Sequence, residues 1–113
     1  MTVDLEQIGA VALARITGRV DAYTSPDLDQ RLRESVGAGR HLVLDLGGTD
    51  YMSSAGLRVL LGLAKRASAE GFELRLCGMR PEVSEVFDIA GVTPLFTILD
   101  TAQEALGELA SAE

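Results

Sequence analysis

The segment HLVLDLGGTDYMSSAGLRVLL, His41–Leu61, joins an apolar run, a glycine pair, two adjacent serines and the beginning of a second apolar pattern. Its first six residues are nearly all apolar, which is typical of a strand covered on both faces of a sheet. After the serines, apolar residues return at the spacing i, i+3, i+4 and i+7, which predicts an amphipathic helix; they are Leu57, Leu60, Leu61 and Ala64. The segment therefore predicts a buried strand that leads into a helix, with hydroxyl groups where the helix begins.

The rest of the chain places further strands and helices on both sides of this segment. Two short alternating runs flank Gly9 and predict an antiparallel hairpin. Helical patterns alternate with apolar strands after it, which favours parallel crossovers with helices layered on the sheet. The helices are expected near 25–36, 54–67, 81–90 and 101–110, and the later strands near 72–78 and 95–100. We predict an α/β fold, a single domain over residues 1–113, with a mixed, mostly parallel sheet of four to five strands and about four helices.

Composition excludes several classes of function. The chain has 113 residues and a net charge of −7, so it lacks the basic face that nucleic acids or anionic membrane surfaces require. Cys77 is the only cysteine, which rules out an internal disulfide and favours the cytoplasm. His41 is the only histidine and has no cluster of cysteines around it, so no metal site is expected.

Ser53 and Ser54 have two possible roles at the start of the predicted helix. Either serine can cap the helix by accepting a bond from a free backbone amide, a contribution of about 1 kcal/mol. Gly56 suggests a second role, because alanine would favour the helix there by about 1 kcal/mol. The missing Cβ of Gly56 leaves room for another molecule to approach the Ser54 hydroxyl. One of the two serines is therefore a candidate for chemical modification.

A candidate docking patch adjoins the serines. Tyr51 and Met52 are large apolar residues in an expected loop, where core packing does not obviously require them. On the predicted helix, several small or apolar residues lie on a flank between the apolar face that packs on the core and the charged face that meets solvent. Exposed apolar patches often mark binding sites for partner proteins. The predicted interface consists of Tyr51, Met52, Ser53, Ala55, Val59 and Leu63.

Over nearly its whole length the sequence resembles STAS domains, and specifically the bacterial anti-sigma factor antagonists. The resemblance lies in GRVDAYTSPDL (18–28), in the segment 41–61 quoted above and in GMRPEVSEVFDIAG (78–91). It implies that the serine two residues before Gly-Leu, here Ser54, is phosphorylated by an anti-sigma factor that is itself a kinase. Asp21 resembles the acidic residue that lies near the phosphoacceptor in relatives. Asp21 also fits an Asx-type turn before the first helix.

Two departures from the family pattern affect the assignment of the acceptor. The residue before the acceptor is often aspartate in the family, and here Ser53 replaces it. The residue after the acceptor is often serine or threonine, and here it is Ala55. Ser53 is thus the alternative acceptor, although the spacing to Gly-Leu favours Ser54.

The resemblance also implies partners. The unphosphorylated protein is expected to bind a kinase-type anti-sigma factor and release its sigma factor, and phosphorylation of Ser54 is expected to end that binding. A serine phosphatase would reset the switch. No cofactor is expected, because the kinase supplies ATP.

Three other functions compete with this one. An enzyme is disfavoured, because the serines lack a G-x-S-x-G elbow and His41 offers no convincing general base. A constitutive STAS subunit of a lipid-transport or stressosome-like complex would use the same surface without phosphate turnover. A third alternative is a small-ligand binding site at the end of the sheet where the serines are expected.

Overall fold

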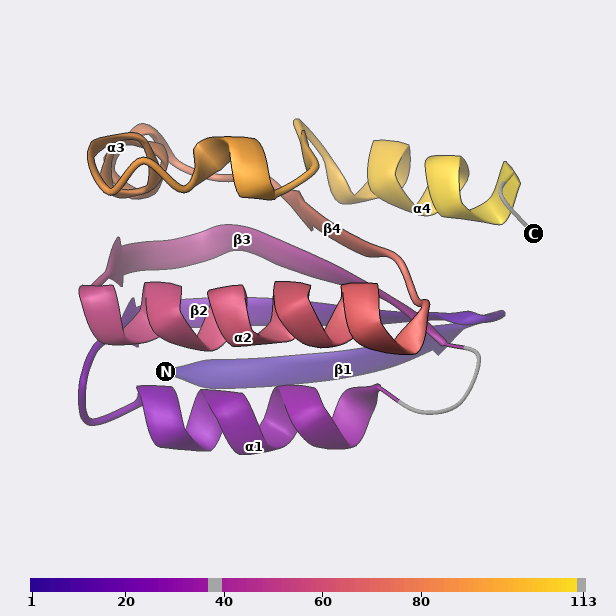
Figure 1. The fold of residues 1–113 in the computed structure, drawn as a ribbon, viewed down its shortest axis with the longest axis horizontal. Coiled ribbons are helices and arrows are strands. Elements are labelled where there is room, and N and C mark those ends of the chain that lie inside the picture. Colours follow the sequence, from indigo (N-terminus) through magenta and orange to yellow (C-terminus); the bar gives the residue numbers. More distant parts are fainter. Residues whose placement is uncertain (37–39, 112–113) are drawn as a thin grey trace.

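Five strands form one mixed sheet in the order β1-β2-β3-β4-β5 in the computed structural model, which describes residues 1–36 and 40–111 (Figure 1). The strands are β1 (Thr2–Ile8), β2 (Val11–Val20), β3 (His41–Met52), β4 (Leu74–Cys77) and β5 (Ile98–Leu99). The helices are α1 (Ser25–Ser35), α2 (Ser54–Glu70), α3 (Pro81–Ile89) and α4 (Ala102–Ser111), with a 3₁₀ turn η1 over Thr93–Leu95. The predicted α/β fold, with four to five strands and about four helices, is confirmed: the described residues form five strands and four α-helices.

The hairpin of β1 and β2 is the antiparallel part of the sheet. Gly9 makes its turn at a φ of +60°, a backbone conformation that glycine adopts without strain. The other neighbouring strands are parallel: β2 with β3, β3 with β4, and β4 with β5. The carboxyl ends of β2, β3 and β4 consequently lie at the same end of the sheet, which we call the rim.

β3 is longer than the sequence pattern predicts. It does not stop after Leu46 but continues through the glycine pair to Met52, so the expected loop around Tyr51 is strand. The pairing with β2 shifts register twice along this extension. A Cβ on Gly48 would lie 2.8 Å from the Thr17 hydroxyl oxygen, so glycine is needed where the two strands approach.

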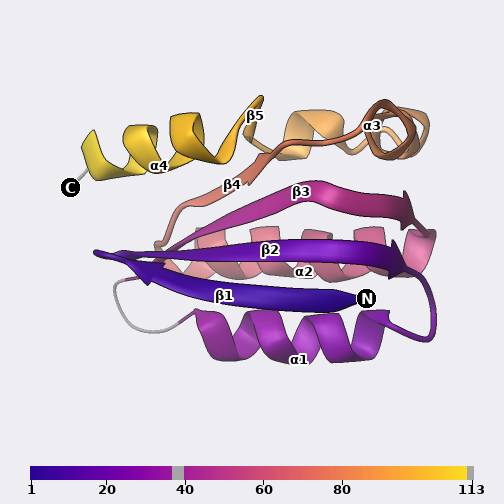
Figure 2. The same cartoon turned by 180° about the vertical axis from the view of Figure 1, so that it is seen from behind.

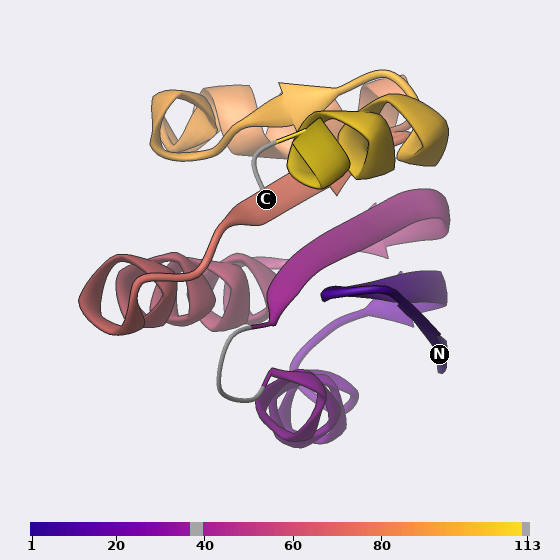
Figure 3. The same cartoon turned by 90° about the vertical axis from the view of Figure 1, so that its right-hand side faces the viewer.

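Helices cover both faces of the sheet. α1 and α2 lie side by side in front of the strands in Figure 1, and the view from behind in Figure 2 shows the strands first. Their buried residues, such as Leu28, Leu32 and Leu60, pack with β-strand residues into the larger apolar core. α4 buries Ala105 and Leu109 in a second, smaller core. Figure 3 shows α4 at the opposite end of the molecule from α1.

The second core contains Cys77, which is fully buried in β4 with Leu13 and Val43 among its cluster. Cys77 is therefore a packing residue of this strand. The last strand is shorter than expected, because η1 takes up the beginning of the predicted run 95–100 and β5 keeps Ile98–Leu99. Within the described part of the chain, no helix combines the length and apolar character that a membrane crossing requires.

Candidate functional site

The rim brings the end of β2 next to the start of α2. Val20 and Met52 are paired residues at the ends of β2 and β3. The amide of Ser53 then donates a hydrogen bond of 2.9 Å to the carbonyl oxygen of Val20. Because Asp21 follows Val20 directly, the loop after β2 lies beside the two serines. This is the neighbourhood that the family resemblance implies for Asp21.

The two serines have different environments. Ser53 is the N-cap of α2, with extended backbone angles and a side chain that accepts a 3.4 Å hydrogen bond from the amide of Gly56. Ser54 is the first helical residue and is exposed. Within residues 1–36 and 40–111, its hydroxyl has no hydrogen-bond partner. The cap role therefore belongs to Ser53, and the free hydroxyl belongs to Ser54.

Asp21 organises its own loop. One carboxylate oxygen accepts hydrogen bonds from the amides of Tyr23 at 2.9 Å and Thr24 at 3.1 Å, and the other pairs with Arg19 at 3.1 Å. The bond from the Thr24 amide, followed by those from Tyr23 and Arg19, holds the pKa of the Asp21 carboxyl below its ordinary value. The Asx-type turn is confirmed. No hydrogen bond joins Asp21 to Ser54 among the described residues, so Asp21 places the loop rather than the hydroxyl.

Two side chains at the rim, Arg19 and Tyr23, were not predicted from the sequence. The guanidinium carbon of Arg19 lies 3.9 Å from the centre of the Tyr51 ring, a cation–π contact between residues paired across β2 and β3. Tyr23 is 93% exposed in the loop after Asp21. Only the register of β2 against β3, which the sequence does not reveal, places Arg19 against Tyr51.

Gly56 serves a different purpose from the one predicted. A Cβ at this position would collide with the Met52 sulfur and would lie 2.7 Å from Cγ1 of Val20. Gly56 is itself buried. The expectation that its missing Cβ gives another molecule access to Ser54 is wrong. The glycine allows the first turn of α2 to pack against the ends of β2 and β3.

The predicted docking patch is only partly accessible. Met52 is 2% exposed because it ends a strand and packs under α2, so its inclusion in the interface was wrong. Leu63 is 5% exposed and belongs to the core. Tyr51 is 40% exposed, and Ser53, Ala55 and Val59 are each partly exposed.

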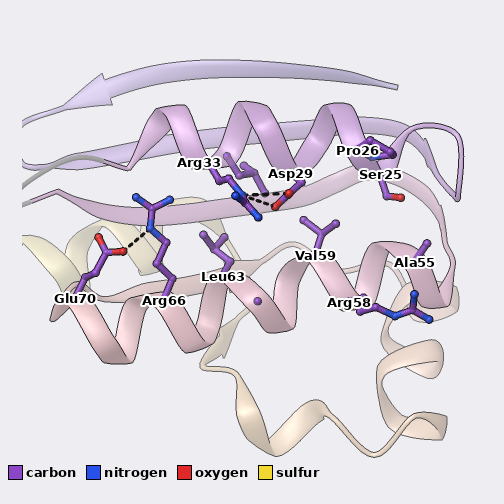
Figure 4. Close-up of a pocket in the computed structure, with 12 residues that line it drawn as sticks. Ser25, Pro26, Asp29, Arg33, Ala55, Arg58, Val59, Leu63, Arg66 and Glu70 are labelled. Carbon is purple, nitrogen blue, oxygen red and sulfur yellow. Dashed lines mark hydrogen bonds and ion pairs between the residues drawn. The ribbon is translucent and has the colours of Figure 1, made fainter.

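A groove between α1 and α2 runs past this patch. Its volume is about 890 Å³. Figure 4 shows Ala55, Val59 and Leu63 facing it from α2, and Ser25, Asp29 and Arg33 facing it from α1. The groove thus has an apolar floor with charged side chains along its edges. In the residues that the structure describes, no three histidine, cysteine or acidic side chains gather as a metal site would require.

Known proteins resemble this chain both in sequence and in fold. BtrV of Bordetella bronchiseptica, whose name assigns it provisionally to the anti-sigma factor antagonists, is 36% identical over 113 residues, which are 99% of this chain and 97% of that protein. The anti-sigma F factor antagonist of Paenibacillus polymyxa is 30% identical over 111 residues, covering 96% of this chain and 95% of its own. The solved structure of the anti-sigma factor antagonist SpoIIAA in its unphosphorylated form superposes with a TM-score of 0.83 at 20% identity and covers 97% of each chain.

The family model described as the STAS domain matches residues 2–105, which leaves out Met1 and residues 106–113, the larger part of α4 among them. The match includes the whole rim, both serines and the groove between α1 and α2. The chain belongs to the STAS domain family.

Proposed function

We propose that this protein is an anti-sigma factor antagonist that is switched by phosphorylation of Ser54. Its unmodified form binds a kinase-type anti-sigma factor and so releases a sigma factor. The observation that carries this proposal is the exposed Ser54 hydroxyl, which has no hydrogen-bond partner in the described part of the chain, while Ser53 supplies the cap. The hydroxyl can be modified without removing any bond of the fold.

The relatives support the same proposal. BtrV and the Paenibacillus polymyxa protein carry names of anti-sigma factor antagonists, and both align over nearly their whole length. The SpoIIAA structure is described as the unphosphorylated form of that protein, which names a phosphorylation state for a domain of the same fold. These names favour a regulator that acts on an anti-sigma factor, and we propose that it works in the cytoplasm.

Charge provides the physical mechanism of the switch. Phosphorylation adds roughly −1.5 to −2 charges and three acceptor oxygens at neutral pH. At the N-terminus of its own helix, a phosphate is favoured by the free amides and the helix dipole, so the fold is expected to survive. In a complex, the same phosphate must lose water against a surface shaped for a hydroxyl. A hundredfold loss of affinity needs only about 2.8 kcal/mol.

The partner surface that we propose surrounds Ser54. It consists of Tyr51, Ser53, Ala55 and Val59, joined by Arg19 and the exposed Tyr23. Tyrosine and arginine are the side chains that most often anchor protein interfaces. A serine phosphatase that reaches the same exposed residue would restore the binding form.

The test is phosphorylation in vitro. The purified protein is incubated with ATP and with kinase-type anti-sigma factors from its own genome, and then weighed by mass spectrometry. We expect one added phosphate on the natural sequence and on Ser53→Ala, and none on Ser54→Ala, which should bind the anti-sigma factor permanently. Phosphorylation of Ser54→Ala at the natural rate would overturn the assignment. No phosphate on any form would favour the constitutive interaction subunit instead.

A further inference from the structure

The arginines at the rim differ in the interactions that their guanidinium groups make. Arg19 pairs with Asp21 and stacks on Tyr51. Arg80, just before α3, donates a 2.9 Å hydrogen bond from Nε to the carbonyl oxygen of Gly47. Arg58 is exposed, and within the described ranges it makes neither an ion pair nor a hydrogen bond. Its guanidinium keeps all five donors available.

Arg58 lies one turn after Ser54 on α2. Residues four apart on a helix are neighbours on one face, with Cβ atoms about 6 Å apart. Helical side chains also lean toward the N-terminus of their helix. In Figure 4 the Arg58 side chain extends along the first turn toward the beginning of α2, where Ser54 lies. The long guanidinium side chain can reach a group attached to the Ser54 oxygen without any change in the backbone.

We propose that Arg58 is the positioning residue for phosphoserine at position 54, pairing with the phosphate within the same helix. The inference rests on the proposed function, because it concerns the modified form of the same hydroxyl. Phosphate and guanidinium match in geometry, since two parallel N–H donors can engage two phosphate oxygens. The pair holds the phosphate against α2 instead of leaving it free in solvent.

This pairing also changes the groove between α1 and α2. Arg33 and Asp29 form an ion pair along its edge at 3.1 Å, and Arg66 pairs with Glu70 at 2.6 Å. Arg58 is the remaining charged residue of the lining, and it is unpaired within the described residues. In the unmodified protein it is available to an acidic side chain of the partner. Phosphorylation thus adds negative charge at the rim and withdraws the cation that a partner would use.

The experiment measures the ionisation of the phosphate directly. Phosphoserine is inserted at position 54 during translation, so no kinase is needed, and its second pKa is followed by ³¹P NMR. The variants are Arg58→Gln and the conservative Arg58→Lys, with Arg31→Gln as control, an exposed arginine of α1 that pairs with Asp27. The charged groups at or just after the ends of β2 and β3, which are Arg19, Asp21 and Asp50, are the same in every form. Their effects cancel in the comparison.

We expect a second pKa about 0.3 unit lower in the natural sequence than in Arg58→Gln, the size of an exposed i,i+4 ion pair. Arg58→Lys should keep most of the shift, and Arg31→Gln all of it. Equal pKa values in the natural sequence and in Arg58→Gln would overturn the inference. If this shift is found but no kinase modifies Ser54, the proposed function fails and the pairing stands.

Discussion

The amide of Ser53 donates a 2.9 Å hydrogen bond to the carbonyl of Val20, which fastens the start of α2 to the end of β2. With its amide held there and its hydroxyl accepting from Gly56, Ser53 is fixed on both sides. Ser54 is the next residue and the first helical one, so its outward position follows from that of Ser53. The structural role of the cap thus falls to Ser53, which leaves the Ser54 hydroxyl for the modification that we propose.

This division predicts different effects on stability for two serine substitutions. Ser53→Ala removes the cap and should lower the free energy of unfolding by about 0.5–1 kcal/mol, at the low end for a cap because the bond is long. Ser54→Ala removes no hydrogen bond and should leave stability within about 0.5 kcal/mol, as surface substitutions usually do. Urea unfolding of both variants measures the difference. Equal losses in the two would show that Ser54 shares the cap.

Two glycines of α2 predict opposite outcomes for the same change. Gly56→Ala should lower the free energy of unfolding by about 1–2 kcal/mol, since overpacking against Met52 and Val20 exceeds the gain in helix propensity. Gly62→Ala is the matched control in the same helix, where an added Cβ meets nothing within 4 Å. It should raise stability by up to about 1 kcal/mol. Urea unfolding checks both, and a stabilised Gly56→Ala protein would contradict the packing account.

The order of elements could be predicted because each carries its own local pattern. Each of these patterns can be recognised within a short stretch of sequence. Examples are the turn at Gly9, the apolar run after His41 and the helical spacing after Ser54. The extension of β3 could not be predicted, because it depends on Gly48 packing against Thr17, a contact between strands far apart in the chain. The prediction that Met52 lies in a loop was wrong for the same reason. A residue in an expected loop became the buried end of a strand.

The candidate site shows the same limit. Ser54 and Asp21 became candidates through the resemblance to the family, which rests on local motifs, and the Asx-type turn of Asp21 could also be predicted from its place before the first helix. The role of Gly56 was misread, because a glycine in a first turn looks the same whether the space beside it is open or filled by another side chain. Arg19 was missed, since only the cross-strand register shows that it lies against Tyr51.

Asp21 should make stability depend on pH. Its pKa is lowered in the folded protein by the amide of Thr24 first and then by Tyr23 and Arg19. The ionised carboxylate therefore stabilises the fold above the unfolded pKa, near 3.8, and this contribution disappears as pH falls through the lower folded value. Asp21→Asn should lower the melting temperature at pH 7, and the difference from the natural sequence should shrink as pH falls below 3.8 and vanish once the pH is below the lowered folded pKa.

Thermal unfolding between pH 2.5 and 7 checks the prediction for Asp21. Asp50→Asn is the matched control, because Asp50 is exposed and forms no ion pair within the described residues. Both variants remove one negative charge from a chain with a net charge of −7. If Asp50→Asn destabilises as much as Asp21→Asn at pH 7, general charge and not the turn explains the effect.

Cys77 should be inert as long as the protein is folded. Burial, with a smaller contribution from the charge of Asp45, raises the pKa of the Cys77 thiol from 9.0 to about 11. At pH 8 this shift reduces the reactive thiolate by about a hundredfold, and burial restricts access further. Alkylation by iodoacetamide should therefore be at least about a hundredfold slower in the native protein than in urea. Between pH 8 and 10 the native rate should rise about tenfold per pH unit, because the thiolate fraction does so below the pKa. A native rate equal to that in urea would mean that β4 opens readily, and the second core under α4 would then not protect it.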